Sequence, residues 1–174
     1  VEYTGETQSW HLLHYLVEEI GLDKIRDAVK NPLKMNIAAY YGPDMQREGA
    51  CAGDDPFMPS YMEQLIEALG GTPVDYDSKC MSVGSTSMLT LEDSSLAMTA
   101  AVLSDAIESG AELVVSACTM SHINLDSYQS KAGRVSGKNT TVPVCHLSEM
   151  VAFALGFYPD RLAQLRTRVR LIGS

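Results

Sequence analysis

The sequence predicts an α/β protein in which an open, mainly parallel sheet carries helices on both faces. Short apolar segments alternate with amphipathic segments from residue 34 to residue 156, which is typical of parallel sheets built from strand–helix–strand units. The segment LVVSA at 113–117 has almost no polar alternation, as expected of a strand covered on both faces. One or two further helices are expected ahead of the sheet.

Residues 1–33 are expected to form a helical lead-in, and residues 34–174 an α/β domain with a C-terminal helix, together one structural unit. An apolar stripe over residues 8–30 is interrupted at Gly21 and ends before Pro32, because the residue before a proline is driven out of the α region. The expected strands are 34–42, 72–76, 113–117 and 141–147. The expected helices between and after them are 60–71, 90–112, 119–133 and 147–156.

Net charge, apolar runs and the number of cysteines disfavour several classes of function. The chain has 174 residues and a net charge of -9, which disfavours binding to a phosphate backbone, so no nucleic-acid partner is expected. No run approaches the roughly 20 apolar residues of a membrane span. Four cysteines are few for a disulfide scaffold, which favours free thiols and a cytoplasmic location. The basic residues of the C-terminal segment, 160–170, suit the end of a helix.

The carboxyl ends of parallel strands meet at one edge of the sheet, where ligands bind in open α/β folds. Cys118 follows the strand at 113–117 and begins the next helix, where the helix dipole lowers a thiol pKa. Several chemistries remain open at this edge. Cys118 pairs with His122 or His146 as a nucleophile in one interpretation, and with Cys80 as a redox thiol pair in another.

A zinc site drawn from Cys80, Cys118, His122 and Cys51 is the third interpretation, although the spacing does not compel it. Cys145, inside an apolar strand, is expected to be a small buried hydrophobe. The two histidines of the first helix, His11 and His14, are expected to lie away from this edge as surface or packing residues.

Six motifs then follow one another along the chain. They are YYGP at 40–43, DDP at 54–56, EALGG at 67–71, CMSVGS at 80–85, CTMSHINLDSYQ at 118–129 and PVCHLSE at 143–149. In this order and spacing they resemble the cysteine-rich CCG domain found in the B subunit of heterodisulfide reductase and in related iron–sulfur oxidoreductases. The resemblance covers residues 10–157, and the lead-in is similar to that of the second of two CCG repeats in longer members.

The resemblance implies that cysteines of these motifs hold an unusual iron–sulfur cluster. Aligned on the motifs, the cluster positions of this chain are occupied by Pro43, Ser82, Val83, Cys118 and Ser121. Only Cys118 is a cysteine in register, and Cys80 is displaced by two residues. One thiolate in register does not hold a four-iron cluster, so no cofactor is expected in the isolated chain.

The resemblance therefore implies a component of an oxidoreductase complex whose own cluster site is degenerate. The partners expected are a second copy of the chain or other subunits of a redox complex. Two alternatives stay open: a binding module that reuses the vacated crevice for a small molecule, and a zinc or thiol redox site at Cys80 and Cys118. A cluster completed by ligands of a partner is a further alternative for the cofactor.

Overall fold

The structure is a computed structural model and describes residues 5–6, 9–47 and 53–157. Its strands are β1 (Asn36–Tyr40), β2 (Thr72–Val74), β3 (Leu113–Ser116) and β4 (Val144–His146). All three pairings are parallel, and the strand order is β2-β1-β3-β4. This arrangement confirms the open parallel sheet that the alternation of apolar and amphipathic segments predicts.

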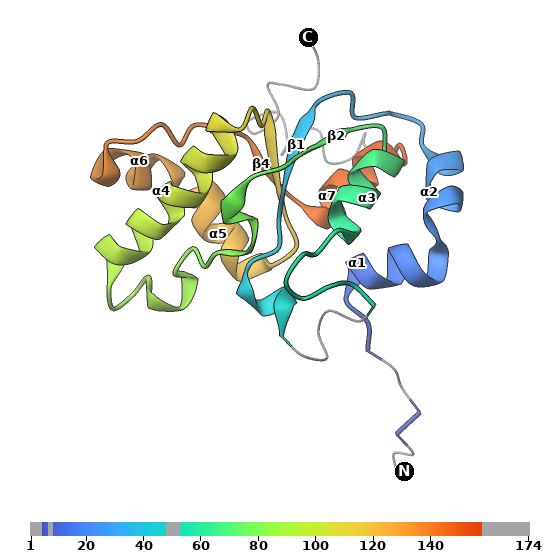
Figure 1. Ribbon diagram of the computed structural model, residues 1–174, viewed down its shortest axis with the longest axis horizontal. Helices are drawn as coiled ribbons and strands as arrows, with labels where there is room; N and C mark the ends of the chain where they lie inside the picture. The colour runs from blue at the N-terminus through green and yellow to red at the C-terminus, as the bar shows by residue number, and fades with distance from the viewer. Residues whose placement is uncertain (1–4, 7–8, 48–52, 158–174) are drawn as a thin grey trace.

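Helices cover both faces of the sheet, as expected (Figure 1). The α-helices are α1 (Leu12–His14), α2 (Leu22–Ala28), α3 (Tyr61–Ala68), α4 (Glu92–Glu108), α5 (Thr119–Ser127), α6 (Gln129–Ser136) and α7 (Leu147–Ala154). A π-helix, η1 (Tyr15–Ile20), continues α1, and 3-10 turns lie at η2 (Pro43–Gln46), η3 (Asp77–Cys80) and η4 (Ser85–Ser87). In Figure 1, α4, α5 and α6 lie on one side of the sheet and α1, α2, α3 and α7 on the other.

Each face of the sheet has its own apolar core, because neighbouring residues of a strand point in opposite directions. Ile37 and Ala39 of β1 pack into the core on the α3 and α7 side. Ala38 and Tyr40 pack into the core on the α4 and α5 side. Leu13, from the N-terminal lead-in, is fully buried in the first of these cores, so the lead-in packs against the sheet domain.

The element boundaries differ from the expectation at several places, and β1, β2 and α4 are each shorter than the expected 34–42, 72–76 and 90–112. The first helix begins at Leu12 rather than at residue 8, and Gly21 separates it from α2 with a φ of 87°, a conformation that favours glycine. The helix expected over 119–133 is divided at Tyr128 into α5 and α6. The strand expected at 141–147 is limited to β4. The expected C-terminal helix falls in 158–174, outside the described residues.

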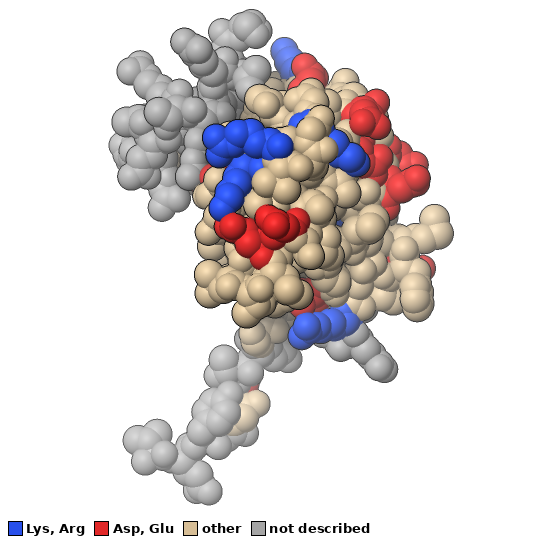
Figure 2. All heavy atoms as spheres, turned by 90° about the vertical axis from the view of Figure 1, so that its left-hand side faces the viewer, with Lys and Arg blue, Asp and Glu red and all other residues tan. Residues whose placement is uncertain are grey.

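Charges on the α4–α6 side are mixed in sign (Figure 2). Lys131 of α6 forms an ion pair with Glu92 of α4, at 2.6 Å. Both side chains are nearly half exposed, so the pair contributes little to stability.

Candidate functional site

The carboxyl edge of the sheet gathers the segments that the motifs single out. β1 leads into the turn at Gly42 and Pro43, and β3 leads into Cys118. β4 ends at His146, whose side chain and backbone begin α7 through a capping box with Glu149. The topology thus brings residues more than 100 positions apart in the sequence to one edge.

The loop that contains Ser82 and Val83 is fixed by buried side chains. The Val83 carbonyl accepts hydrogen bonds from Asn124 Nδ2 at 2.9 Å, Thr99 Oγ1 at 3.1 Å and Ser95 Oγ at 3.3 Å. All three donors are buried, and the Val83 side chain is only 1% exposed. Asn124 makes the shortest of these bonds, and a buried carbonyl with several donor groups within reach is held firmly.

The loop requires a glycine at position 84, because of its backbone conformation and the closeness of α4. The φ of Gly84 is 69°, and a Cβ at this position would lie 2.9 Å from the Cα of Ser95. The Gly84 carbonyl accepts a hydrogen bond from Ser95 Oγ at 2.9 Å. The glycine therefore permits both the left-handed backbone and the close approach of α4.

Tyr40 connects this loop to the start of α5. Its hydroxyl donates to the Met81 carbonyl at 2.8 Å and is hydrogen-bonded to the side chain of Ser121. The Tyr40 ring is fully buried, and this burial raises the pKa of its phenol to about 12. Tyr40 thus links the segment at Met81 to the start of α5.

Cys118 is the N-cap residue of α5, as expected from its place after the strand. It has an extended backbone, its carbonyl accepts the His122 amide at 2.9 Å, and its side chain is partly exposed. Pro43, by contrast, is exposed on the 3-10 turn η2 and has no group that ligates a metal.

Cys80 has a different environment from Cys118. It ends η3 and packs against the core on the α3 side. Burial raises the pKa of the Cys80 thiol, with the Lys79 charge opposing this and Glu63 adding to it. No disulfide joins Cys80 to Cys118 in the described part of the chain. The redox-pair interpretation remains a prediction.

Cys145 is a buried thiol of β4, as expected. Burial raises its pKa strongly, so the group stays protonated and is shielded from reagents. Cys51 lies outside the described residues.

The prediction for the N-terminal histidines is wrong for His11, which reaches the carboxyl edge. Its Nε2 lies 3.3 Å from the Ala117 carbonyl, immediately before Cys118. His14 is buried, as expected of a packing residue. The rings of His11 and His14 are 5.6 Å apart, and those of His122 and His146 are 5.8 Å apart in an edge-to-face arrangement. No local pattern in the sequence indicates the His11 contact, because it joins residues 106 positions apart.

Local hydrogen bonds orient the rings of His122 and His146. His122 Nδ1 lies 3.0 Å from Ser116 Oγ, and His146 Nδ1 lies 3.0 Å from Ser148 Oγ. His146 Nε2 is buried and has no hydrogen-bond partner among the described residues. Within residues 5–6, 9–47 and 53–157, no three His, Cys, Asp or Glu side chains are placed to hold a metal ion.

The donor set does not fit the cluster that the resemblance implies. At the five aligned positions, one thiol is accompanied by a proline, a valine and two serines. Val83 is packed in the apolar core, and Ser121 is buried against the Tyr40 hydroxyl. An iron–sulfur cluster requires several thiolate or comparable ligands.

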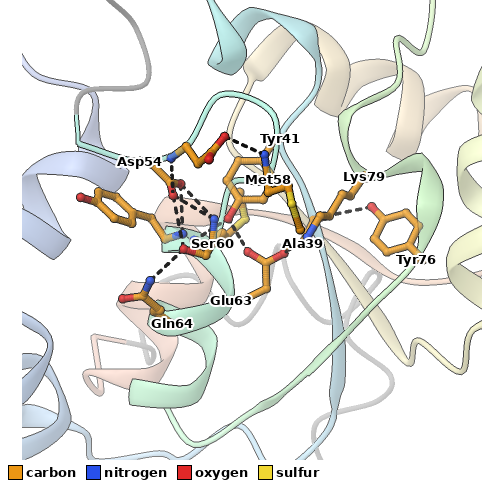
Figure 3. Close-up of polar contacts among 12 residues, drawn as sticks. Ala39, Tyr41, Asp54, Met58, Ser60, Glu63, Gln64, Tyr76 and Lys79 are labelled. Atoms are coloured by element: carbon orange, nitrogen blue, oxygen red, sulfur yellow. Dashed lines mark hydrogen bonds and ion pairs between the residues drawn. The ribbon is translucent and has the colours of Figure 1, made fainter.

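A second polar network lies beneath the same edge, on the α3 side (Figure 3). The Tyr41 hydroxyl donates to Glu63 and accepts the Met62 amide at 2.8 Å. Lys79 Nζ donates to the other oxygen of Glu63 at 2.9 Å. Burial lowers the pKa of Lys79, but the hydrogen bond to Glu63 and the Glu63 charge outweigh this, so the pKa of Lys79 is raised.

The DDP motif has a structural role beside this network. Asp54 is buried, and its carboxylate accepts the backbone amides of Ser60 and Tyr61 at the start of α3 (Figure 3). Asp55 accepts the amides of Phe57 and Met58. The two aspartates thereby fix the loop that leads into α3.

A pocket of about 260 Å³ opens beside β2, away from the vacated positions. Its lining residues are Met58, Pro59, Ser60, Glu63, Pro73, Val74, Asp75 and Lys79. None of the five aligned cluster positions lines this pocket, so it is not the vacated crevice expected of a small-molecule module.

The chain is similar in sequence to several subunits of reductases, although no family model matches it. The B subunit of the ferredoxin:CoB-CoM heterodisulfide reductase of Methanosarcina mazei is 29% identical over 165 residues, which cover 93% of this chain and 55% of that protein. The chain is thus similar to the B subunit of heterodisulfide reductases over nearly its whole length. The resemblance drawn from the motifs is thereby confirmed.

Two further relatives match a similar share of this chain and of their own length. The B subunit of the ferredoxin/F(420)H(2)-dependent CoB-CoM heterodisulfide reductase of Methanosarcina acetivorans is 30% identical over 93% of this chain and 55% of its own length. The 8-methylmenaquinol:fumarate reductase membrane anchor subunit of Wolinella succinogenes is 29% identical over 90% and 55%. The chain thus spans about half the length of these relatives, and all three are named as subunits. Among the described helices of this chain, none has the length and apolar character to cross a bilayer.

Proposed function

We propose that the chain acts as a heterodisulfide-reductase-like CCG domain in a redox complex, without an iron–sulfur cluster of its own. The observation that carries the proposal is the packing at the carboxyl edge. Tyr40 bridges Met81 and Ser121, while Val83 fills the core at an aligned cluster position. The homology supports the redox complex, and this packing supports the missing cluster.

In this proposal the edge is held by protein contacts and needs no cluster. The three donors to the Val83 carbonyl hold the loop at 82–84 in place without any metal. Such a scaffold suits a role in assembly, in which the domain supports a partner that carries the redox centre. We propose that this assembly works in the cytoplasm, where the thiols of Cys80, Cys118 and Cys145 stay reduced.

The partner is proposed to be a second copy of the chain or another component of the complex. Several large apolar side chains are exposed. Those of Phe57, Met58, Met81, Leu89 and Leu91 lie in loops, and that of Met120 lies in the first turn of α5. Exposed large apolar side chains are found at protein interfaces more often than elsewhere on a surface.

Metal and sulfide analysis of the protein, purified without oxygen, tests the proposal. We expect far less than one iron per chain, both for the chain alone and for the chain separated from any co-purifying partner. A brown protein with about four irons per chain would overturn the proposed loss of the cluster. Iron present only in the complex, and lost on separation, would instead favour a cluster completed by the partner.

Light scattering on the same sample tests association. We expect the mass of a dimer or of a complex with a second chain. A monomer at high concentration, with no co-purifying protein, would argue against the proposed partner.

A further inference from the structure

His11 makes two hydrogen bonds that only a neutral imidazole can make together. Its Nδ1 accepts the Leu13 amide at 3.2 Å, which caps α1. Its Nε2 lies 3.3 Å from the Ala117 carbonyl and has to carry the hydrogen, because a carbonyl only accepts. The geometry therefore requires the tautomer with hydrogen on Nε2. Protonation of Nδ1 would turn two donors toward each other at the Leu13 amide.

The Nε2 bond connects the N-terminal lead-in to the end of β3, while the Nδ1 bond is local to α1. Residues 11 and 117 are 106 positions apart in the sequence, and Cys118 follows directly. Beyond His11, the lead-in is anchored by Leu13, which is fully buried in the core. His11 is thus the polar contact between α1 and the segment that bears the partly exposed thiol.

The groups around His11 and His14 determine whether a positive charge on either ring is favoured. His14 and His146 both act on His11 as like charges when protonated, while the Ala117 carbonyl favours the proton. Glu18 and Asp54 act on His14 as opposite charges, and the Tyr61 ring lies 6.0 Å away. The carboxylates therefore offset a charge on His14 rather than one on His11.

We propose that His11 is a pH-sensitive latch that holds α1 against the carboxyl edge, and that its protonation releases α1 and exposes Cys118. Protonation removes the cap of α1, and it adds a charge beside two other histidines. Exposure of Cys118 follows because His11 contacts the residue just before it. The latch does not depend on whether the chain belongs to a redox complex.

The direction of the pKa shifts agrees with this latch. Burial lowers the pKa of His11 and that of His14 below the ordinary value of 6.5. The neutral forms are therefore favoured in the docked state. Docking is complete above pH 6.5 and weakens as the pH falls from there toward the lowered pKa of His11.

Hydrogen exchange measured by mass spectrometry tests the latch on the full chain. The protection of backbone amides in residues 12–20 is compared at pH 7.5 and 5.5, after correction for intrinsic rates, in the wild type and in His11→Asn. Asparagine is a good N-cap that does not titrate. We expect the wild type to lose protection severalfold on acidification, because the neutral ring is favoured in the docked state, and the variant to change much less.

Two outcomes would overturn the proposal. One is an equal loss of protection in the wild type and in His11→Asn, and the other is no loss in the wild type. Circular dichroism establishes that the variant is folded. Independently of any variant, nitrogen NMR of the wild type at pH 7.5 should show hydrogen on His11 Nε2. Hydrogen on Nδ1 would contradict the required tautomer.

Discussion

The two halves of the carboxyl edge are held in different ways. On the α5 side, buried Ser95, Thr99 and Asn124 converge on one carbonyl, and the bonds do not depend on the protonation of any group. On the α1 side, His11 provides the polar contact, and its two bonds require a neutral ring. The comparison shows how one edge combines a fixed half with a half that responds to pH.

Asn124→Asp should have the largest effect, because it breaks the fixed half. The new carboxyl group would face the Val83 carbonyl in a buried site, with no donor to offer when ionised. We expect a loss of about 3 kcal/mol in the free energy of unfolding. Chemical denaturation measures it. Asn139→Asp is the matched control, since Asn139 is exposed and accepts through an oxygen that aspartate keeps, and it should change stability by less than about 0.5 kcal/mol.

Tyr40→Phe should have a smaller effect of the same kind. It removes the hydroxyl that bonds Met81 and Ser121 and leaves the ring in the core. We expect a loss of about 1–2 kcal/mol, measured by denaturation. Tyr15→Phe, at an exposed tyrosine, is the control. Equal effects of the two substitutions would show that the Tyr40 hydroxyl does not hold the loop.

Much of this edge was open to prediction from the sequence. Strand ends in a parallel sheet meet by topology, so the positions of Cys118 and His146 followed from the alternation of elements. The His11 contact did not, because it joins residues 106 positions apart in the sequence and leaves no local pattern. The three donors to the Val83 carbonyl could not be predicted from the sequence for a related reason. Serine, threonine and asparagine inside helices usually indicate exposed positions, and here tertiary packing places them in the core.

The α1 half should lose stability in acid. Because the pKa values of His11 and His14 are lowered, the unfolded chain binds more protons than the folded chain near pH 6. The free energy of unfolding should therefore fall as the pH drops from about 7.5 to 5.5. His11→Asn should reduce this slope. A stability that rises on acidification over this range would contradict the neutral state assigned to both rings.

The rates at which Cys118 and Cys145 react with a thiol reagent should differ. This is the smallest of the expected effects on the fold. Cys118 is partly exposed at a helix start, whereas Cys145 is buried with a raised pKa. Iodoacetamide should therefore modify Cys118 well before Cys145, as followed by peptide mass spectrometry. Cys118→Ser is the control for the site of labelling. Faster modification of Cys145 would contradict the burial of β4.

Chemical reconstitution tests the central claim most directly. The isolated chain is incubated without oxygen with iron, sulfide and a reductant, then desalted and assayed for both elements and for visible absorbance. A domain with Pro43, Ser82, Val83 and Ser121 at the aligned positions should retain far less than one iron per chain. Retention of about four irons and matching sulfide, with cluster absorbance that survives desalting, would contradict the account.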